Sequence, residues 1–240
     1  MAVISTKAIV ISALKYSDSS LIVKCFTEQE GLKSYLLRGV LKAKKGNIKA
    51  AYFQPLTQLK IEATHKQKST LHTLKDVTVL HQYNTIYQDI IKQSIVLFLS
   101  EVLSSCVQEE EKNTPFFSYL ENAFLWLDTH ENISNFHLLF LLNLTHFLGF
   151  YPDTTNQHKT VFSLLEGNFT NSTHEKLTIS GNKLTLLKKL LGINFDAIEN
   201  VSFNKQERQA ILQMIIQYFE LHLDGFRKPK SLAILETVFS

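Results

Sequence analysis

Residues 21–38, LIVKCFTEQEGLKSYLLR, contain the pattern that decides the fold. Residues 21–27 and 32–38 are short apolar segments with a period of two, which is typical of β-strands. Gly31 lies in the connection between them, and glycine readily takes the positive φ angle that a short hairpin loop needs. The stretch therefore predicts two strands that pair with each other.

Three more strands are predicted around this pair, over residues 3–14, 57–64 and 71–79. In the segment 57–64, apolar and polar side chains alternate, as expected for a sheet with one wet face. Five short strands in about 80 residues, with a long connection between the third and the fourth, suit a small closed barrel. We therefore predict a five-stranded OB-fold.

From about Asn84 the apolar spacing becomes helical, with intervals of three and four residues. Thr114-Pro115 and Ser134 predict helix starts, and Asn204 with Glu207 resembles a capping box. The predicted fold class is α+β. An N-terminal OB-fold barrel (1–80) precedes an all-α helical domain (81–240), which carries a small irregular insert at about 151–181.

The two parts of the chain differ in charge. Residues 1–80 hold 13 Lys/Arg and 5 Asp/Glu, whereas residues 81–240 hold 12 and 17. Such a difference in sign indicates that one part meets a polyanion while the other folds or recruits partners. Five cations fall within twelve residues that contain no acid and form a predicted basic loop: Arg38, Lys42, Lys44, Lys45 and Lys49.

A basic loop beside a sheet suits nucleic acid, because each lysine near a phosphate releases condensed counterions and needs no base-specific geometry. The alternative is a solvated surface loop, although acids normally intersperse a solubilising surface. Tyr35, Tyr52 and Phe53 flank the loop and are candidates to stack on exposed bases. Each ring alone is more typical of a core.

Motifs for catalysis and metal binding are missing from the sequence. It has no HExxH pattern, no cysteine pair at zinc spacing and no Gly-rich phosphate loop ending in Gly-Lys-Ser/Thr. We therefore predict no catalytic residue, no metal and no cofactor, and we expect a protein that is not an enzyme. Cys25 and Cys106, far apart in apolar stretches, are typical of reduced, buried thiols.

Membrane insertion is not expected either. The most apolar run, residues 136–150, is interrupted by polar side chains and falls short of the roughly 20 residues that span a bilayer. We interpret it as a core helix. The N-terminal stretch alternates like a strand and does not resemble a signal peptide.

Five strings of this sequence carry a resemblance by their order and spacing: KAIVISALKYSDSSLIVKCFTEQEGLKSYLLRGVLKAKKG (7–46), AYFQPLTQLKIE (51–62), FLLNLTHFLGFYPD (140–153), FSLLEGNFT (162–170) and LDGFRKPKSLAILETVF (223–239). Together they resemble the RecO family of bacterial recombination mediators. The resemblance covers most of the chain.

The resemblance implies an N-terminal OB-fold followed by a helical domain. It also implies binding of single- and double-stranded DNA, annealing of complementary strands, and loading of RecA together with RecR and the C-terminal tail of single-stranded DNA-binding protein (SSB). The implied location is the bacterial cytoplasm, at the nucleoid. The family's basic OB face corresponds to the basic loop, and its C-terminal basic element corresponds to Arg227, Lys228 and Lys230.

The insert departs from the family pattern. Many relatives carry four zinc-binding cysteines there, but residues 151–181 contain no cysteine, so zinc is not predicted. Apolar residues around Gly167 instead predict a small hairpin packed against the helices: Phe162, Leu164, Leu165 and Phe169.

Two other functions stay open at this point. An OB-fold with a basic loop does not by itself distinguish DNA from RNA, so an RNA-binding or ribosome-associated factor is one alternative. The other is a helical scaffold for protein partners, in which the basic loop meets an acidic protein.

Overall fold

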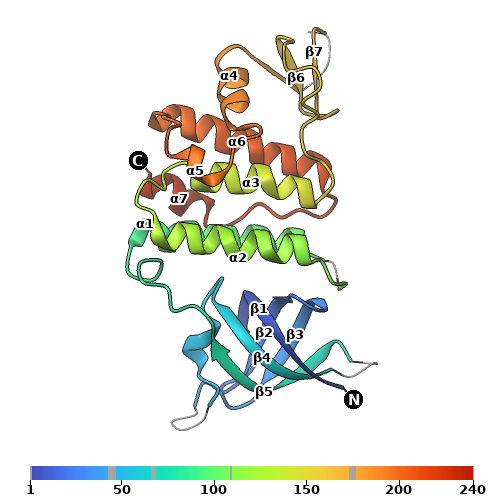
Figure 1. Cartoon of the computed structure of the whole chain (residues 1–240), viewed down its shortest axis with the longest axis vertical. Helices are drawn as coiled ribbons and strands as arrows, with labels where there is room; N and C mark the ends of the chain where they lie inside the picture. Colours follow the sequence, from blue (N-terminus) through green and yellow to red (C-terminus); the bar gives the residue numbers. More distant parts are fainter. Residues whose placement is uncertain (1, 43–46, 66–68, 109, 173–176, 240) are drawn as a thin grey trace. The chain divides into compact units, whose positions relative to one another are not determined.

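The computed structural model of the 240-residue chain describes residues 2–42, 47–65, 69–108, 110–172 and 177–239. The chain forms two compact units, Met1–Thr129 and His130–Ser240. A β-barrel and two long helices make up the first unit, and helices with a small sheet make up the second (Figure 1). The predicted α+β class, with a barrel followed by helices, is confirmed.

The strands of the first unit form a closed barrel in the order β1-β2-β3-β5-β4. The long first strand pairs antiparallel with β2 and with β4 and so closes the ring. β3 and β5 are parallel and pair only through Ser34 with Leu71 and Tyr35 with His72. This is the predicted five-stranded, OB-like barrel. Its strands are β1 (Ala2–Lys15), β2 (Leu21–Thr27), β3 (Gly31–Leu37), β4 (Gln58–His65) and β5 (Leu71–Val79).

The local predictions for the barrel hold with one exception. β2 and β3 pair as expected, and Gly31 has a φ of 65° in the turn between them. On β4, Leu59 and Ile61 are fully buried while Lys60 is exposed, as the alternation predicted. Gln58 is the exception, because its Nε2 donates to the carbonyl oxygen of Glu121 at 3.0 Å and the side chain is buried.

Two helices, α1 (Ile90–Cys106) and α2 (Thr114–Thr129), pack against the barrel. The Ser100 hydroxyl donates to the Ile11 carbonyl at 2.9 Å, and the Phe26 and Phe116 rings lie 5.0 Å apart. Secondary structure therefore changes after residue 80, as expected, whereas the compact unit extends to Thr129. The predicted boundary between 80 and 81 marks that change in secondary structure and is not where the units divide.

The segment that joins β5 to α1 is fixed by the end of α2. The Asp128 carboxylate accepts hydrogen bonds from the backbone N–H groups of Asn84, Thr85 and Ile86. Burial alone raises the pKa of Asp128, but these donors outweigh it and hold the pKa below its usual value. The buried Lys92 ammonium donates to Thr85 Oγ1 at 2.7 Å and to the Asp128 carbonyl at 3.1 Å.

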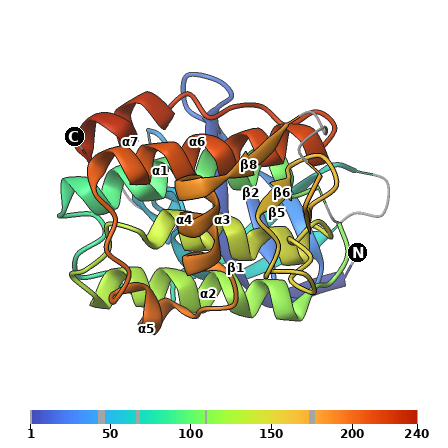
Figure 2. The same cartoon turned by 90° about the horizontal axis from the view of Figure 1, so that it is seen from above.

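The second unit is built around the apolar helix α3 (Phe136–Phe147) and the amphipathic helix α6 (Lys205–His222), which pack against each other and against α4 (Gly181–Leu190) (Figure 2). The predicted capping box is present, since the Asn204 side chain and the Glu207 side chain each accept from the other residue's backbone N–H. The remaining elements are α5 (Phe195–Ile198), α7 (Leu232–Val238), β6 (Val161–Ser163), β7 (Asn168–Thr170) and β8 (Thr178–Ser180).

The insert forms a hairpin that packs on α6, as predicted. Phe162 and Phe169 face each other across β6 and β7, with ring centroids 5.0 Å apart, and both are buried. Gly167 has a φ of 65°, and a Cβ at that position would lie 2.5 Å from Tyr218 Oη. Leu164 is buried, whereas Leu165 is 52% exposed and lies outside this cluster.

Zinc does not fit the described residues of the insert, 151–172 and 177–181. Within the described chain, no group of three His, Cys, Asp or Glu side chains is placed to hold a metal ion. The interior of the hairpin is aromatic instead, and aromatic carbon offers no ligand atoms for zinc.

Both cysteines are free, buried thiols, as predicted. Burial raises the pKa of Cys25 and that of Cys106 to about 12, so both stay protonated and unreactive at neutral pH. The apolar run 136–150 forms a buried helix over Phe136–Phe147 and the turn that follows it. No helix in the described residues is long and apolar enough to cross a membrane.

Candidate nucleic-acid interface

The predicted basic loop lies in the connection between β3 and β4, residues 38–57. Val40 and Phe53 are buried in the barrel core and anchor the two parts of the connection. Between these anchors, Lys42 and Lys49 are exposed, and Arg38 is exposed just before them. Lys44 and Lys45 lie outside the described residues. The connection thus presents at least three cations to solvent from a backbone that is attached to the barrel at both ends.

The first half of this connection is held against the turn between β1 and β2. The Leu41 N–H donates to the Ser19 carbonyl at 3.0 Å, and the Gly39 N–H donates to Ser20 Oγ at 3.4 Å. Gly39 has a φ of 72°, which lets the chain turn so that the Lys42 N–H reaches the Gly39 carbonyl. Arg38 and Lys42 therefore project from an ordered turn.

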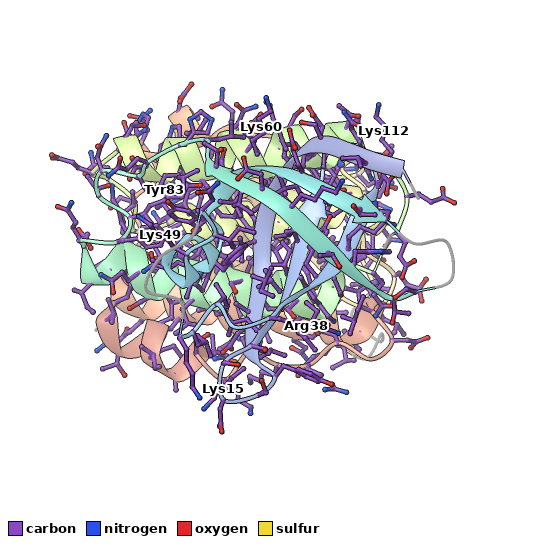
Figure 3. The ribbon with its side chains drawn as sticks, turned by 90° about the horizontal axis from the view of Figure 1, so that it is seen from below. Lys15, Arg38, Lys49, Lys60, Tyr83 and Lys112 are labelled. Atoms are coloured by element: carbon purple, nitrogen blue, oxygen red, sulfur yellow. The ribbon has the colours of Figure 1, made fainter. Side chains whose placement is uncertain are left out.

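Two strand residues extend the basic surface. Lys60 on β4 and Lys75 on β5 are exposed on the outside of the barrel. None of the five cations Arg38, Lys42, Lys49, Lys60 and Lys75 forms an ion pair with a described residue. Their charges are thus available to an external polyanion. In Figure 3, which looks at the barrel from the side opposite α1 and α2, Arg38, Lys49 and Lys60 lie around its rim.

Tyr35 does not stack on bases, contrary to the prediction. Its side chain is fully buried in the barrel, and its hydroxyl is 3.0 Å from His65 Nε2. Burial raises the pKa of Tyr35. Phe53 is likewise buried in the core. The reason is the alternation of β3, which turns position 35 inward, and the need for an apolar anchor at position 53.

Tyr52 remains the candidate for stacking. It is half-buried at the end of a short 3-10 helix (Ala50–Phe53), and its ring centroid lies 6.0 Å from Lys49 Nζ. Part of the ring packs on the barrel core. The remainder faces a hollow in the surface.

Two grooves flank β5. The β3–β5 groove has a volume of about 750 Å³ and is lined in part by Arg38 and Lys75. It exists because β3 and β5 pair at only two positions and leave a gap beyond them. The tyrosine groove has a volume of about 870 Å³ and is lined by three tyrosines, Tyr52, Tyr83 and Tyr87, together with Lys49. Asn47 lines both grooves, which therefore meet.

Two of these tyrosines donate their hydroxyl protons to backbone carbonyls. Tyr83 donates to the Leu56 carbonyl at 3.1 Å, and Tyr87 donates to the Pro55 carbonyl at 3.0 Å. Burial raises the pKa of Tyr87 to about 12 and the pKa of Tyr83 well above its ordinary value, so both stay neutral. These bonds fix the positions of the two rings. Tyr83 and Lys49, both labelled in Figure 3, line the same groove.

The C-terminal basic element belongs to the second unit. Arg227, Lys228 and Lys230 are exposed between α6 and α7. Lys228 lines a groove of about 640 Å³ that also contains Glu220 and Glu236. These acids weaken the local positive field.

Sequence reasoning missed three features of this surface. It placed Lys60 on the wet face of a strand but did not connect it with the basic loop, although the alternation was sufficient to do so. It did not select Lys75, which lines the β3–β5 groove. The grooves depend on how β3 and β5 diverge, and the residue pattern within a single strand does not predict the path of another strand.

Two family models match the chain in succession. "Recombination protein O N terminal" matches residues 1–83, and "Recombination protein O C terminal" matches residues 87–233. The chain belongs to the RecO family. The short interval between the two matches falls where strands give way to helices.

Curated relatives agree over the full length of the chain. It is 51% identical to DNA repair protein RecO of Flavobacterium johnsoniae and 49% identical to that of Flavobacterium psychrophilum, each over 237 residues and 99% of both chains. DNA repair protein RecO of Bacteroides fragilis is 36% identical over 239 residues, which cover 98% of both. The chain is thus a RecO-family DNA repair protein, and RecO is a family of repair mediators and not a known class of enzymes.

Proposed function

We propose that this chain is a non-enzymatic recombination mediator. It binds single- and double-stranded DNA, anneals complementary strands and, together with RecR, helps to load RecA onto DNA coated with SSB. The observation that carries this proposal is the set of exposed cations on the barrel, which form no ion pair with a described residue and three of which, Arg38, Lys49 and Lys75, line two grooves that share Asn47. Membership in a family of DNA repair proteins supports it.

The mechanism is electrostatic. Two DNA strands repel each other, and so do a bare strand and a strand already covered by its binding protein. Cations that contact phosphates release counterions and lower this repulsion, so that base pairing can nucleate. Arg38 and Lys42 on an ordered turn supply such contacts without chemistry at the DNA itself.

The second unit supplies docking surfaces for protein partners in this proposal. Its groove is lined by the apolar Ile179 and Met214 and the cations Lys183 and Lys228, together with the acids Glu220 and Glu236. Apolar contacts next to cations match an extended peptide that ends in a carboxylate, as the C-terminal tail of SSB does. RecR is the second proposed partner, and the site of action is the nucleoid in the bacterial cytoplasm.

Fluorescence anisotropy with a labelled single-stranded DNA oligomer, titrated at several salt concentrations, tests the proposal. The expected result is binding whose affinity falls linearly on a log–log plot against salt. A matched RNA oligomer is the control. Equal or tighter binding of RNA would favour the RNA-binding alternative, and no binding of either oligomer at low salt would assign the basic loop to a protein partner.

A further inference from the structure

We propose that the tyrosine groove holds one unpaired base of single-stranded DNA, with the ring of Tyr52 as the stacking surface. The groove is lined by Tyr52, Tyr83, Tyr87, Lys49 and the amides Gln54 and Gln82. This inference rests on the proposed DNA binding and extends it. Phosphate contacts need no contact with a base, whereas here the groove binds the base itself.

The walls of the groove suit a flat ring. Its volume of about 870 Å³ lies in the range of ligand sites. The rings of Tyr83 and Tyr87 pack edge to face, with centroids 5.7 Å apart, and their hydroxyls are held by backbone carbonyls. They therefore form fixed walls of aromatic carbon and offer no hydroxyl proton to the ligand. Tyr83 is buried, whereas Tyr52 and Tyr87 are both half-buried. Because the Tyr87 hydroxyl is bound to a backbone carbonyl while Tyr52 lies beside Lys49, Tyr52 is the ring that we assign to the base.

The groove also offers groups that match the edge of a base. Gln54 and Gln82 are exposed, and neither side-chain amide hydrogen-bonds to a described residue. An amide presents an acceptor and two donors, which is the complement that the polar edge of a base requires. Because every base has a ring face and a polar edge, this combination tolerates different bases.

Charge sets the direction in which the nucleotide enters. Lys49 Nζ lies 6.0 Å from the Tyr52 ring centroid, at the outer limit of a cation–π contact. Asp76 is the acidic residue among those that line the groove. The phosphate is therefore placed at Lys49, and the base points toward the tyrosines. A cation beside an exposed ring is the usual arrangement in proteins that bind single strands.

A base that is paired within a duplex cannot enter this groove, since its ring is stacked and its polar edge is occupied. The groove thus favours single strands, whereas the exposed lysines contact any phosphate chain. Stacking should contribute a factor of about 5 to about 150 in affinity per base.

The experiment compares two labelled oligomers of equal length and charge, a single-stranded oligothymidylate and an abasic phosphodeoxyribose chain. The full-length chain should bind the base-bearing oligomer more tightly by at least about 5-fold. Tyr52→Ala should abolish this preference and leave both the abasic affinity and the salt slope unchanged. Tyr52→Phe keeps the ring and should keep the preference.

Tyr16→Ala is the matched control, because Tyr16 is an exposed tyrosine that does not line the groove. The inference is overturned if the unmodified chain binds both oligomers equally, if the preference is kept in Tyr52→Ala, or if Tyr16→Ala loses it to the same extent as Tyr52→Ala. In those cases DNA binding itself still stands. Failure to bind either oligomer at low salt would instead contradict the proposed function, and the two failures are thereby distinguished.

Discussion

Two long segments of the chain place their side chains in opposite environments. They are the connection between β3 and β4 (residues 38–57) and the insert of the second unit (residues 151–181). The connection is attached at its ends by Val40 and Phe53 and presents cations to solvent between them. The insert turns its aromatic side chains inward and packs on α6. The comparison shows that an irregular segment can be a binding surface or a piece of core, and that charge and aromatic content separate the two.

The largest expected effect concerns the unit that carries the basic connection. Residues 1–129 should fold as an isolated fragment, whereas residues 1–80 should not, because α1 and α2 cover apolar barrel residues such as Phe26 and Ile11. Circular dichroism and urea unfolding measure this. A fragment 1–80 that unfolds cooperatively would show that the barrel is independent and would support the domain boundary predicted at residue 80.

Truncation of a buried side chain of the insert should be far more destabilising than truncation of an exposed one. Phe162→Ala removes a fully buried ring and should lower the free energy of unfolding by about 3 to 5 kcal/mol. Leu165→Ala, on the same hairpin but 52% exposed, is the control and should change it by less than about 0.5 kcal/mol. Equal effects of the two substitutions in urea denaturation would mean that the hairpin is not a piece of core.

Acid should weaken the second unit while the binding surface on the first keeps its charge. His137 is fully buried, and this burial lowers its pKa to about 3. The His137 imidazole is therefore protonated below about pH 6.5 in the unfolded chain, but stays neutral down to about pH 3 in the folded chain. The free energy of unfolding is not reduced by this group above about pH 6.5. It falls as the pH drops from 6.5 toward 3, and at pH 5 the loss is about 2 kcal/mol.

Unfolding at pH 7 and pH 5, in the original chain and in His137→Leu, measures this contribution. The difference between the two pH values should shrink by about 2 kcal/mol in the variant. Asp128 in the first unit acts in the same direction, because its pKa is also lowered, but its contribution is lost only below about pH 3.8. An unchanged pH dependence in His137→Leu would show that the imidazole is protonated in the fold.

The smallest expected effect tests how far the binding surface extends beyond the connection. Lys60→Ala and Lys75→Ala should each reduce the salt slope of single-strand binding by about 0.7, the value for one phosphate contact. Lys205→Ala, an exposed lysine at the start of α6, is the control and should leave the slope unchanged. If Lys60 and Lys75 behave like Lys205, the interface is confined to the connection itself.

Local patterns were sufficient to predict most of the fold. Alternation located the barrel strands, Gly31 located a hairpin turn, and Asn204 with Glu207 located the start of α6. Packing between distant segments was not predictable in the same way. The burial of Gln58 depends on a carbonyl in α2, and the end of the first unit at Thr129 depends on contacts that the strand-to-helix change does not reveal.

The candidate site was predicted in its charges but not in its shape. A basic run without acids identified Arg38, Lys42 and Lys49 as exposed cations. The aromatic candidates needed the fold, since Tyr35 points inward on β3 while Tyr52 faces a groove. Tyr83 and Tyr87, which complete that groove, come from the segment after β5 and have no local signal that links them to the basic connection.

The central claim is that cations on the barrel bind single-stranded DNA, and its most direct test is the salt slope of Arg38→Ala/Lys42→Ala. Anisotropy titrations should show a slope reduced by about 1.4 relative to the original chain, because two phosphate contacts are lost. Lys112→Ala/Lys205→Ala removes two exposed charges elsewhere and should leave the slope unchanged. An unaltered slope in the Arg38/Lys42 variant, or an equal reduction in both variants, would contradict the account.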